Sequence, residues 1–155
     1  MSIQDLLTYV SLIRFTQRER IELSMLGCTA TIGISYKIAY VLGVHFRAGE
    51  WGCRRCGSVI TTIFEGRSRY CNVTKFVRVG RRNFACVEWL SEPRYPYAPM
   101  TVVARVGLLS RDRQLEMPIL IPLESIDPTP VLVEPDTDGR HFYMMRVHGY
   151  DSTGS

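Results

Sequence analysis

The residues best suited to chemistry in this sequence are Cys53 and Cys56, which are separated by two residues and followed by Gly57. In a tight turn of this kind two thiolates point at one metal ion. The glycine lets the backbone turn back, so that its N–H groups approach the sulfurs. The segment from Trp51 to Ser58 therefore predicts a zinc knuckle, a short turn that binds zinc through two cysteines.

Two more cysteines follow the knuckle, Cys71 and Cys86, each after a gap of fourteen residues. Gaps of this length are typical of zinc-ribbon-like loops, in which strands return the chain to the metal. We expect one structural Zn²⁺ bound by these four sulfurs, with His45 as the alternative fourth ligand. The fifth cysteine, Cys28, lies on the apolar face of a predicted strand, where a buried thiol is more common than a ligand.

Two other interpretations of the cysteines remain open. A redox CxxC usually opens a helix that lowers a thiol pKa, but Gly57 and the β-branched run at 59–62 argue against a helix here. All five cysteines could also be buried, reduced thiols. A catalytic zinc needs an open coordination position and a nearby base, and neither an H-x-E nor an H-E-x-x-H pattern is present. We therefore expect no enzyme activity.

The net charge of +4 is unevenly distributed along the chain. Residues 1–90 contain 13 Lys and Arg against 6 Asp and Glu, whereas residues 91–155 contain 6 against 9. Of the basic residues, 17 are Arg and only 2 are Lys. Because the arginine fork binds phosphate with two hydrogen bonds and stacks on bases, this bias favours a nucleic-acid surface. A preference for arginine codons in the source genome would produce the same bias.

The basic residues concentrate in the knuckle and in two predicted turns. If zinc holds these loops together, the side chains form one patch that contacts RNA through its phosphates. Interleaved aromatics could stack on unpaired bases, although core packing explains them more simply; they are Trp51, Phe64, Tyr70 and Phe76. The predicted RNA-contacting residues are Arg54, Arg55, Arg67, Arg69, Lys75, Arg78, Arg81 and Arg82.

Hydrophobic spacing predicts a single, mainly β (α+β) domain over residues 1–155, with short antiparallel strands, hairpins and one N-terminal helix. The helix is expected over 2–14. A period of two predicts strands over 21–25 and 28–46, with a bend near Gly33 or a second strand after Gly43. Further strands or extended segments are expected over 59–64, 71–79, 84–90, 101–109, 117–123, 131–134 and 141–148.

The proline-containing stretch 91–99 is expected to be an irregular loop. It would separate a basic, zinc-bearing part of about residues 1–90 from a C-terminal β part of about residues 100–150. Residues 1–14 lack the features of a signal peptide, and no run approaches the roughly 20 apolar residues of a membrane span. We therefore expect a cytoplasmic protein that is not secreted and has no membrane span, and in that reducing setting CxxC indicates metal or redox chemistry.

The knuckle also carries a family resemblance. A small protein with Cys53-x2-Cys56, a downstream Cys71 and adjacent arginines resembles the cysteine-rich zinc-finger accessory proteins of plant RNA viruses. The nearest in layout is the small protein encoded first in sobemovirus genomes, and some carlavirus nucleic-acid-binding proteins are also similar. The resemblance covers Trp51 to Cys86. It implies a viral suppressor of RNA silencing that acts in the host cytoplasm, with RNA or a host silencing protein as partner.

The sequence thus favours a non-enzymatic zinc-binding protein that contacts RNA through an arginine-rich surface. The alternative is a zinc-stabilised protein–protein interaction module that uses its β-edges or its proline-containing loop and makes no nucleic-acid contact. A zinc or thiol enzyme is a more distant third interpretation. Whether the chain forms a homo-oligomer is left open by the sequence.

Overall fold

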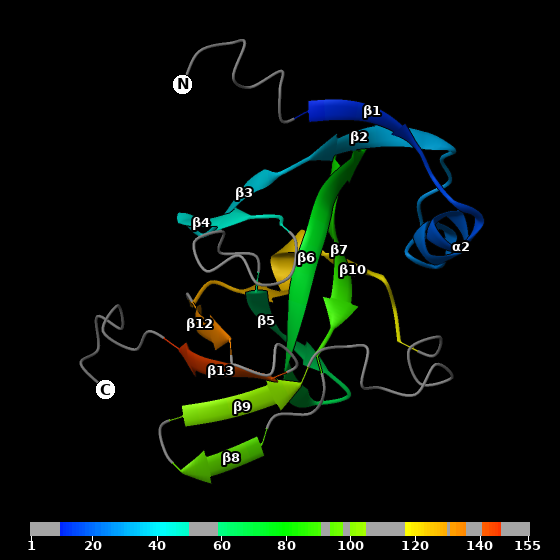
Figure 1. Cartoon of the computed structure of the whole chain (residues 1–155). Coiled ribbons are helices and arrows are strands. Elements are labelled where there is room, and N and C mark those ends of the chain that lie inside the picture. Colours follow the sequence, from blue (N-terminus) through cyan, green and yellow to red (C-terminus); the bar gives the residue numbers. More distant parts are fainter. Residues whose placement is uncertain are drawn as a thin grey trace.

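The computed structural model describes residues 10–49, 59–90, 94–97, 100–104, 117–129, 131–135 and 141–146. Strands make up most of these residues and pair in antiparallel sheets, and helix α2 comes early in the sequence, as its blue colour in Figure 1 shows. The predicted mainly β fold with an N-terminal helix is therefore confirmed. The segment 51–58, which the same prediction expects to form a zinc knuckle, lies outside the described residues.

The largest sheet has seven strands and is organised around β6, which is 13 residues long. β6 pairs with β2 and β5 along one edge and with β7 along the other. β1 continues the sheet beyond β2, β11 beyond β5, and β10 beyond β7. The strands are β1 (Val10–Arg14), β2 (Ile32–Tyr36), β5 (Val59–Phe64), β6 (Arg67–Val79), β7 (Arg82–Trp89), β10 (Leu120–Pro122) and β11 (Ile126–Asp127).

Two smaller sheets accompany the large one. A four-stranded sheet has the order β12 (Val131–Pro135), β13 (His141–Arg146), β9 (Met100–Ala104) and β8 (Arg94–Tyr97). A hairpin consists of β3 (Ile38–Val41) and β4 (Val44–Arg47). The short 3-10 helix η2 (Leu123–Ser125) joins β10 to β11. Because β10 pairs with β7 and β11 with β5, the predicted N-terminal and C-terminal parts contribute strands to one sheet.

The helix lies later in the chain than predicted. Within the expected helix 2–14, residues 10–14 form β1, and residues 2–9 lie outside the described residues. Helix α2 (Gln17–Met25) instead starts at a capping box: the Thr16 side chain accepts from the Glu19 amide, and the Glu19 carboxylate accepts from the Thr16 amide. The spacing Thr16-x-x-Glu19 is a recognised helix start, so this signal was available in the sequence.

Residues 21–25 are helical, so the predicted strand there is wrong. Their alternation of apolar and polar residues does not reflect a buried face, because only Leu23 is buried while Ile21 and Met25 are exposed. The long alternating run 28–46 is interrupted at Lys37 and at the turn Leu42-Gly43 rather than at Gly33. The predicted second strand after Gly43 is confirmed, since β4 begins at Val44.

Most of the other predicted strands are confirmed. Residues 59–64 form β5, and the hairpin predicted over 71–79 and 84–90 is that of β6 and β7. The predicted hairpin near the C-terminus is that of β12 and β13. The stretch 91–99, expected to be irregular, contains the short strand β8, so that prediction is corrected.

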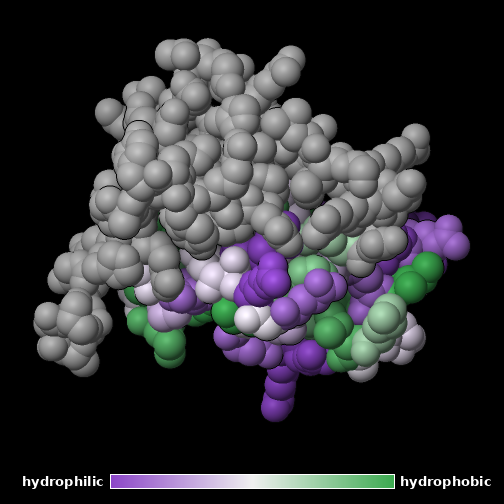
Figure 2. All heavy atoms as spheres, turned by 90° about the horizontal axis from the view of Figure 1, so that it is seen from below, coloured by the Kyte–Doolittle hydropathy of each residue, from purple (hydrophilic) through white to green (hydrophobic). Residues whose placement is uncertain are grey.

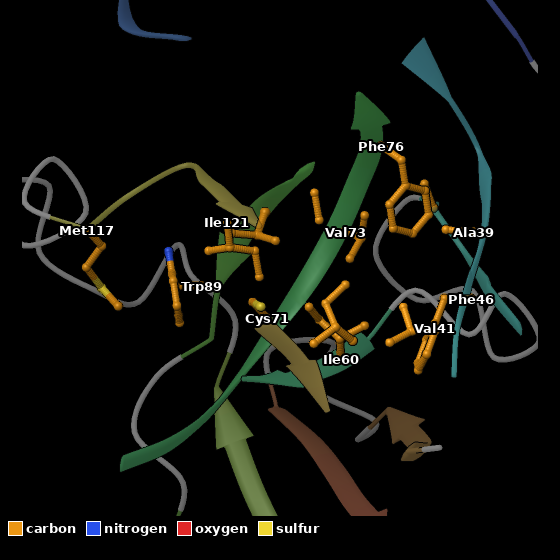
Figure 3. Close-up of a cluster of buried hydrophobic side chains, with 14 residues drawn as sticks. Ala39, Val41, Phe46, Ile60, Cys71, Val73, Phe76, Trp89, Met117 and Ile121 are labelled. Carbon is orange, nitrogen blue, oxygen red and sulfur yellow. The ribbon is translucent and has the colours of Figure 1, made fainter. Parts of the chain in front are cut away.

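The large sheet buries a hydrophobic cluster on each face. One cluster lies between the sheet and the β3–β4 hairpin and contains Phe76, Trp89 and Ile60 (Figure 3). The other lies under α2 and contains Leu23 and Phe84. Each large side chain buried in this way contributes about 1.5–3 kcal/mol through removal of apolar surface from water. Packing on both faces therefore stabilises the large sheet.

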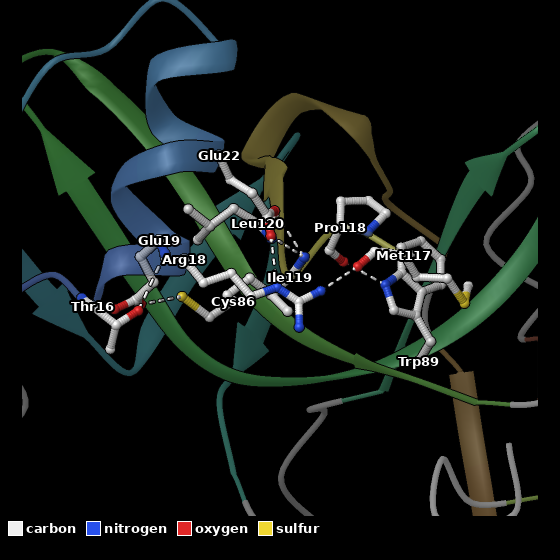
Figure 4. A network of polar contacts seen from close by, with 10 residues as sticks. All are labelled: Thr16, Arg18, Glu19, Glu22, Cys86, Trp89, Met117, Pro118, Ile119 and Leu120. Atoms are coloured by element: carbon white, nitrogen blue, oxygen red, sulfur yellow. Dashed lines mark hydrogen bonds and ion pairs between the residues drawn. The ribbon is translucent and has the colours of Figure 1, made fainter. Parts of the chain in front are cut away.

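Polar contacts attach α2 to the segment before β10 (Figure 4). The Glu22 carboxylate accepts hydrogen bonds from the backbone amides of Ile119 and Leu120, at 2.8 and 3.0 Å. Arg18 donates to the Met117 carbonyl at 2.7 Å. These bonds satisfy buried backbone groups that would otherwise be costly, so the helix and the returning chain stabilise each other.

Candidate nucleic-acid interface

The predicted knuckle residues Cys53 and Cys56 lie outside the described residues, but both ends of the segment 50–58 are described. Gly49 donates its amide to the Val73 carbonyl and accepts from the Asn72 side chain, both at 3.0 Å. At the other end, Val59 is the register partner of Asn72. The two ends of the segment therefore meet at one point on β6, next to Cys71.

Cys71 and Cys86 are not brought together by the fold. Cys71 is fully buried in the cluster of Figure 3, on the face of the sheet that carries Trp89. Cys86 projects from the opposite face into the α2 cluster, where its thiol donates to the Glu19 carboxylate at 3.7 Å. The predicted set of four sulfurs is therefore corrected: at most one of these two thiols can join Cys53 and Cys56 at a metal.

Burial also sets the protonation of these two thiols. Desolvation raises the pKa of Cys71 far above the usual thiol value, and the nearby Arg69 guanidinium lowers it only in part. Desolvation likewise raises the pKa of Cys86 to about 12, opposed by Lys75 and reinforced by Glu19. In the part of the chain that the structure describes, no three His, Cys, Asp or Glu residues are grouped closely enough to hold a metal ion.

The remaining predicted ligand, His45, lies on the outward face of the β3–β4 hairpin. Its side chain is exposed, and its ring packs against that of Tyr40 with the centroids 5.3 Å apart. Cys28 is buried in the α2 cluster, as predicted for a core thiol.

Two of the predicted RNA-contacting residues are engaged inside the protein. Arg69 is only 4% exposed and donates to the Leu90 carbonyl at 3.0 Å, so its prediction as a surface contact is wrong. Lys75 is half-buried and forms an ion pair with Glu19 at 3.1 Å. Arg54 and Arg55 lie outside the described residues.

The other predicted arginines do not form one patch. Arg67 begins β6, and Arg81 lies in the turn that follows its end. Because β6 has 13 residues at about 3.3 Å per residue, its two ends, and with them Arg67 and Arg81, lie on the order of 40 Å apart. Arg78 is exposed and donates to the Gly80 carbonyl at 2.9 Å, near the Arg81 turn. The basic surface is therefore divided between the two ends of the sheet.

The aromatics interleaved with these arginines belong to the core. Phe76 and Tyr70 are buried, Phe64 is half-buried and packs against Trp89, and Trp51 lies outside the described residues. Core packing, the simpler of the two interpretations, therefore holds for the three that are described.

A groove of about 520 Å³ lies beside the Arg81 turn and was not foreseen from the sequence. Three segments far apart in the chain form its walls: the tip of the β3–β4 hairpin, the start of β7, and the chain around η2. The lining residues are Tyr40, Val41, Leu42, Arg81, Arg82, Asn83, Leu123, Glu124, Ile126 and Pro128.

The hairpin wall of this groove presents large side chains to solvent. Tyr40 is 65% exposed and Leu42 is 87% exposed. Leu42 also has a φ of 49°, in the left-handed region, where Asn or Gly is the usual residue of a two-residue hairpin turn. An exposed leucine in a strained backbone conformation gains nothing for folding, which favours a role in contact.

The register of the hairpin could have predicted the direction in which the Tyr40 side chain points. With Leu42-Gly43 as a two-residue turn, Val41 pairs with Val44 and shares its face, so Tyr40 must point the other way together with His45. The period of two predicted over 28–46 continues through this turn without a change of face, so it does not give this orientation.

The wall of the groove at the start of β7 carries positive charge. Arg81 is exposed and makes no hydrogen bond or ion pair with another described residue. The guanidinium of Arg82 donates to the Leu26 carbonyl and lies 5.0 Å from the centre of the Phe84 ring, which fixes its position. The carboxylate of Glu124 stands on the third wall. An aromatic face, two cations and one acceptor therefore border the same space.

Figure 2 shows the surface of the molecule from below. On this surface the coloured residues mix hydrophilic and hydrophobic side chains, and no single patch of one kind dominates.

No family model, curated protein or solved structure matches this chain. The resemblance to sobemovirus proteins therefore stays a prediction. Among the described helices, none has both the length and the apolar character that crossing a membrane requires.

Proposed function

We propose that the protein binds single-stranded RNA in the groove between the β3–β4 hairpin and the Arg81 turn. The observation that carries the proposal is that the exposed residues Tyr40 and Arg81, which come from segments far apart in the chain, line one groove. Binding of unpaired RNA combines stacking of bases on aromatic rings with neutralisation of phosphates by arginine. The reaction is binding alone, with no chemical step.

Each wall would have a distinct part in this binding. A base stacked on Tyr40 contributes about 1–3 kcal/mol, largely independent of sequence. Arg81 would bind a phosphate, and Arg82, which is already held against Phe84, would add a fixed positive charge. Glu124 is an acceptor for base amino groups and at the same time reduces attraction to phosphate. We therefore expect moderate affinity that depends on salt.

The test compares binding of a fluorescent single-stranded RNA oligonucleotide by the full chain and its variants at several salt concentrations. Arg81→Gln should weaken binding about tenfold and lower the slope of log affinity against log salt by about 0.7, the contribution of one phosphate contact to a single strand. Tyr40→Ser should weaken binding by roughly tenfold at every salt concentration, because stacking is not an ionic contact.

The matched control is Arg67→Gln, which removes the same charge from the first residue of β6, at the end of the strand away from Arg81. This variant should bind as the wild type does, and thermal melting should show that all variants are folded. Absence of salt-dependent RNA binding by the wild type, or equal losses in Arg67→Gln and Arg81→Gln, would overturn the proposal.

The structural zinc is retained as part of this proposal. Its support is the CxxCG sequence and the meeting of both ends of segment 50–58 beside Asn72. If the resemblance to sobemovirus suppressors holds, RNA binding would serve suppression of RNA silencing in the host cytoplasm. The alternative of a protein-interaction module is favoured by a different surface, the exposed apolar side chains of β1 and β2.

A further inference from the structure

Strand β1 is an edge of the seven-stranded sheet. It pairs with β2 over all five of its residues, and no other described strand pairs with its outer side. In Figure 1 it lies at the outer border of the sheet, beyond β2. With respect to the described strands, the outer side of β1 therefore has unpaired backbone N–H and C=O groups that another strand could bind.

Apolar side chains cover one face of the β1–β2 pair. Leu12 lies directly opposite Ile34, and these side chains are 74% and 41% exposed. Val10 and Ile32 are the neighbours on the same face, and both are also exposed. The other face of β1 is used internally, since Ile13 packs against the α2 cluster. We call the four exposed side chains (Val10, Leu12, Ile32 and Ile34) the aliphatic strip.

The edge lacks the features that usually prevent strands from pairing. Natural edge strands carry proline, lysine, inward charges or bulges. β1 has the sequence Val-Ser-Leu-Ile-Arg, its register with β2 has no shift, and its only charge, Arg14, stands at one end. Such an edge is therefore competent to pair as it stands.

We propose that β1 pairs antiparallel with β1 of a second copy of this chain, about a two-fold axis at Leu12. This arrangement joins the two seven-stranded sheets, and the aliphatic strips become continuous across the junction. A two-fold interface of this type is the commonest in homo-oligomers, because one patch then serves both subunits.

Charge selects the direction of pairing. A parallel arrangement in register would place Arg14 beside its own copy, at the strand separation of about 4.8 Å. The antiparallel arrangement places Arg14 opposite Val10 of the second copy and separates the two Arg14 positions by about 14 Å along the strands. That distance exceeds the Debye length of about 8 Å at physiological salt, so their repulsion is screened.

The interface is small. Five residues of strand and four aliphatic side chains bury less than the roughly 800 Å² per partner of a standard interface. We therefore expect a dimer in the micromolar range that dissociates on dilution. Its formation is independent of RNA, because the aliphatic strip and the groove share no residue.

Sedimentation velocity of the full chain should show a monomer–dimer equilibrium between about 1 and 200 µM. Leu12→Lys should abolish the dimer, because the two-fold axis would bring two lysines together. Ile63→Lys is the matched control: Ile63 is also an exposed strand residue but lies in β5, which is paired on both sides. This control should dimerise as the wild type does, and circular dichroism should show both variants folded.

Disulfide formation tests the register. Facing residues of antiparallel strands have Cα atoms about 4.5–5.5 Å apart, within the range that a disulfide spans. Leu12→Cys should therefore form a covalent dimer on mild oxidation, whereas Val10→Cys should not exceed the wild type, because its copies are about 14 Å apart. A monomer at every concentration, a dimer that survives Leu12→Lys, or equal crosslinking of both cysteine variants would overturn the proposal.

Discussion

Lys75 of β6 and Glu19 of α2 form an ion pair with a distance of 3.1 Å between the lysine Nζ and a carboxylate oxygen. The Glu19 carboxylate also accepts the Thr16 amide and the Cys86 thiol, so one buried side chain caps the helix and joins it to two strands. Lys75 was predicted to contact RNA. In the structure it instead helps to attach α2 to the sheet through this ion pair.

Glu19→Gln should lower the free energy of unfolding by about 1–3 kcal/mol at neutral pH, because the variant loses the charged cap and leaves Lys75 without its partner. Burial raises the pKa of Glu19, but the Thr16 amide and Lys75 outweigh it, and the net shift is downward. The stabilisation is therefore present above the ordinary carboxyl pKa and is lost as the pH falls through the lower, folded value.

Urea unfolding of wild type and Glu19→Gln at pH values from neutral to about 3 measures this difference, which should shrink on acidification. Arg20→Gln, an exposed change on the same helix, is the control and should shift stability by less than about 0.5 kcal/mol. A difference that stays constant with pH would show that the carboxylate charge is not involved.

Alkaline pH should destabilise the protein through its buried thiols. The pKa of Cys86 is raised to about 12 and that of Cys71 is also raised, both by burial. Above about pH 8.5 the thiols ionise in the unfolded chain but stay protonated in the folded one. The unfolded state then binds fewer protons, and stability falls by about 1.4 kcal/mol per pH unit for each thiol.

Replacing one thiol should reduce this slope. We expect Cys71→Ala to be less stable than the wild type at pH 7 but to lose stability more slowly between about pH 9 and 11. Val73→Ala creates a cavity in the same cluster without removing a titrating group, so it should keep the wild-type slope. Equal slopes in all three proteins would contradict the assignment.

Gly33→Ala should destabilise the fold by about 3 kcal/mol. A Cβ atom at this position would lie 2.5 Å from the Phe15 ring and 2.9 Å from the Arg78 carbonyl oxygen, and both neighbours are packed. Gly43→Asn is the control, because nothing lies within 4 Å of that position and Asn tolerates a positive φ. Thermal unfolding would separate the two, and a nearly neutral Gly33→Ala would contradict the close approach of Phe15.

Metal analysis of the purified protein should find one zinc ion per chain. Cys53→Ala and Cys56→Ala should each remove it, since both thiolates of the knuckle are needed. Cys86→Val should retain it, because Cys86 projects into the α2 cluster, on the face of the sheet opposite to Cys71. Mass spectrometry under native conditions gives the stoichiometry. An absence of zinc from the wild type would remove the knuckle from the proposed function.

Much of the fold could be predicted because its signals are local. Strand β5 follows from a run of β-prone residues, β6 from apolar residues at alternate positions, and β7 from its place after the hairpin turn. The turns follow from Glu65-Gly66 and Gly80-Arg81. The capping box at Thr16 was equally local but was outweighed by the apolar spacing of residues 2–14. Where two periodicities compete over ten residues, tertiary packing decides between them.

The candidate site was much less predictable. Its walls come from residues 40–42, 81–83 and 123–128, and no local pattern relates segments so far apart. The sequence shows where the basic residues are, but it does not show which of them are buried, paired or exposed in the fold. Arg69 is buried, Lys75 is paired and Arg81 is exposed, although all three belong to one hairpin.

The sequence by itself determined that this chain forms antiparallel strands with hairpin turns and one N-terminal helix, because alternation, turn glycines and caps act between near neighbours. Only the tertiary structure decided what each side chain faces. β6 is packed by α2 on one face and by the β3–β4 hairpin on the other, so neither face is polar by default. Which elements cover the sheet decides that Cys71 and Cys86 lie in clusters on opposite faces. It also decides where the groove at Tyr40 forms.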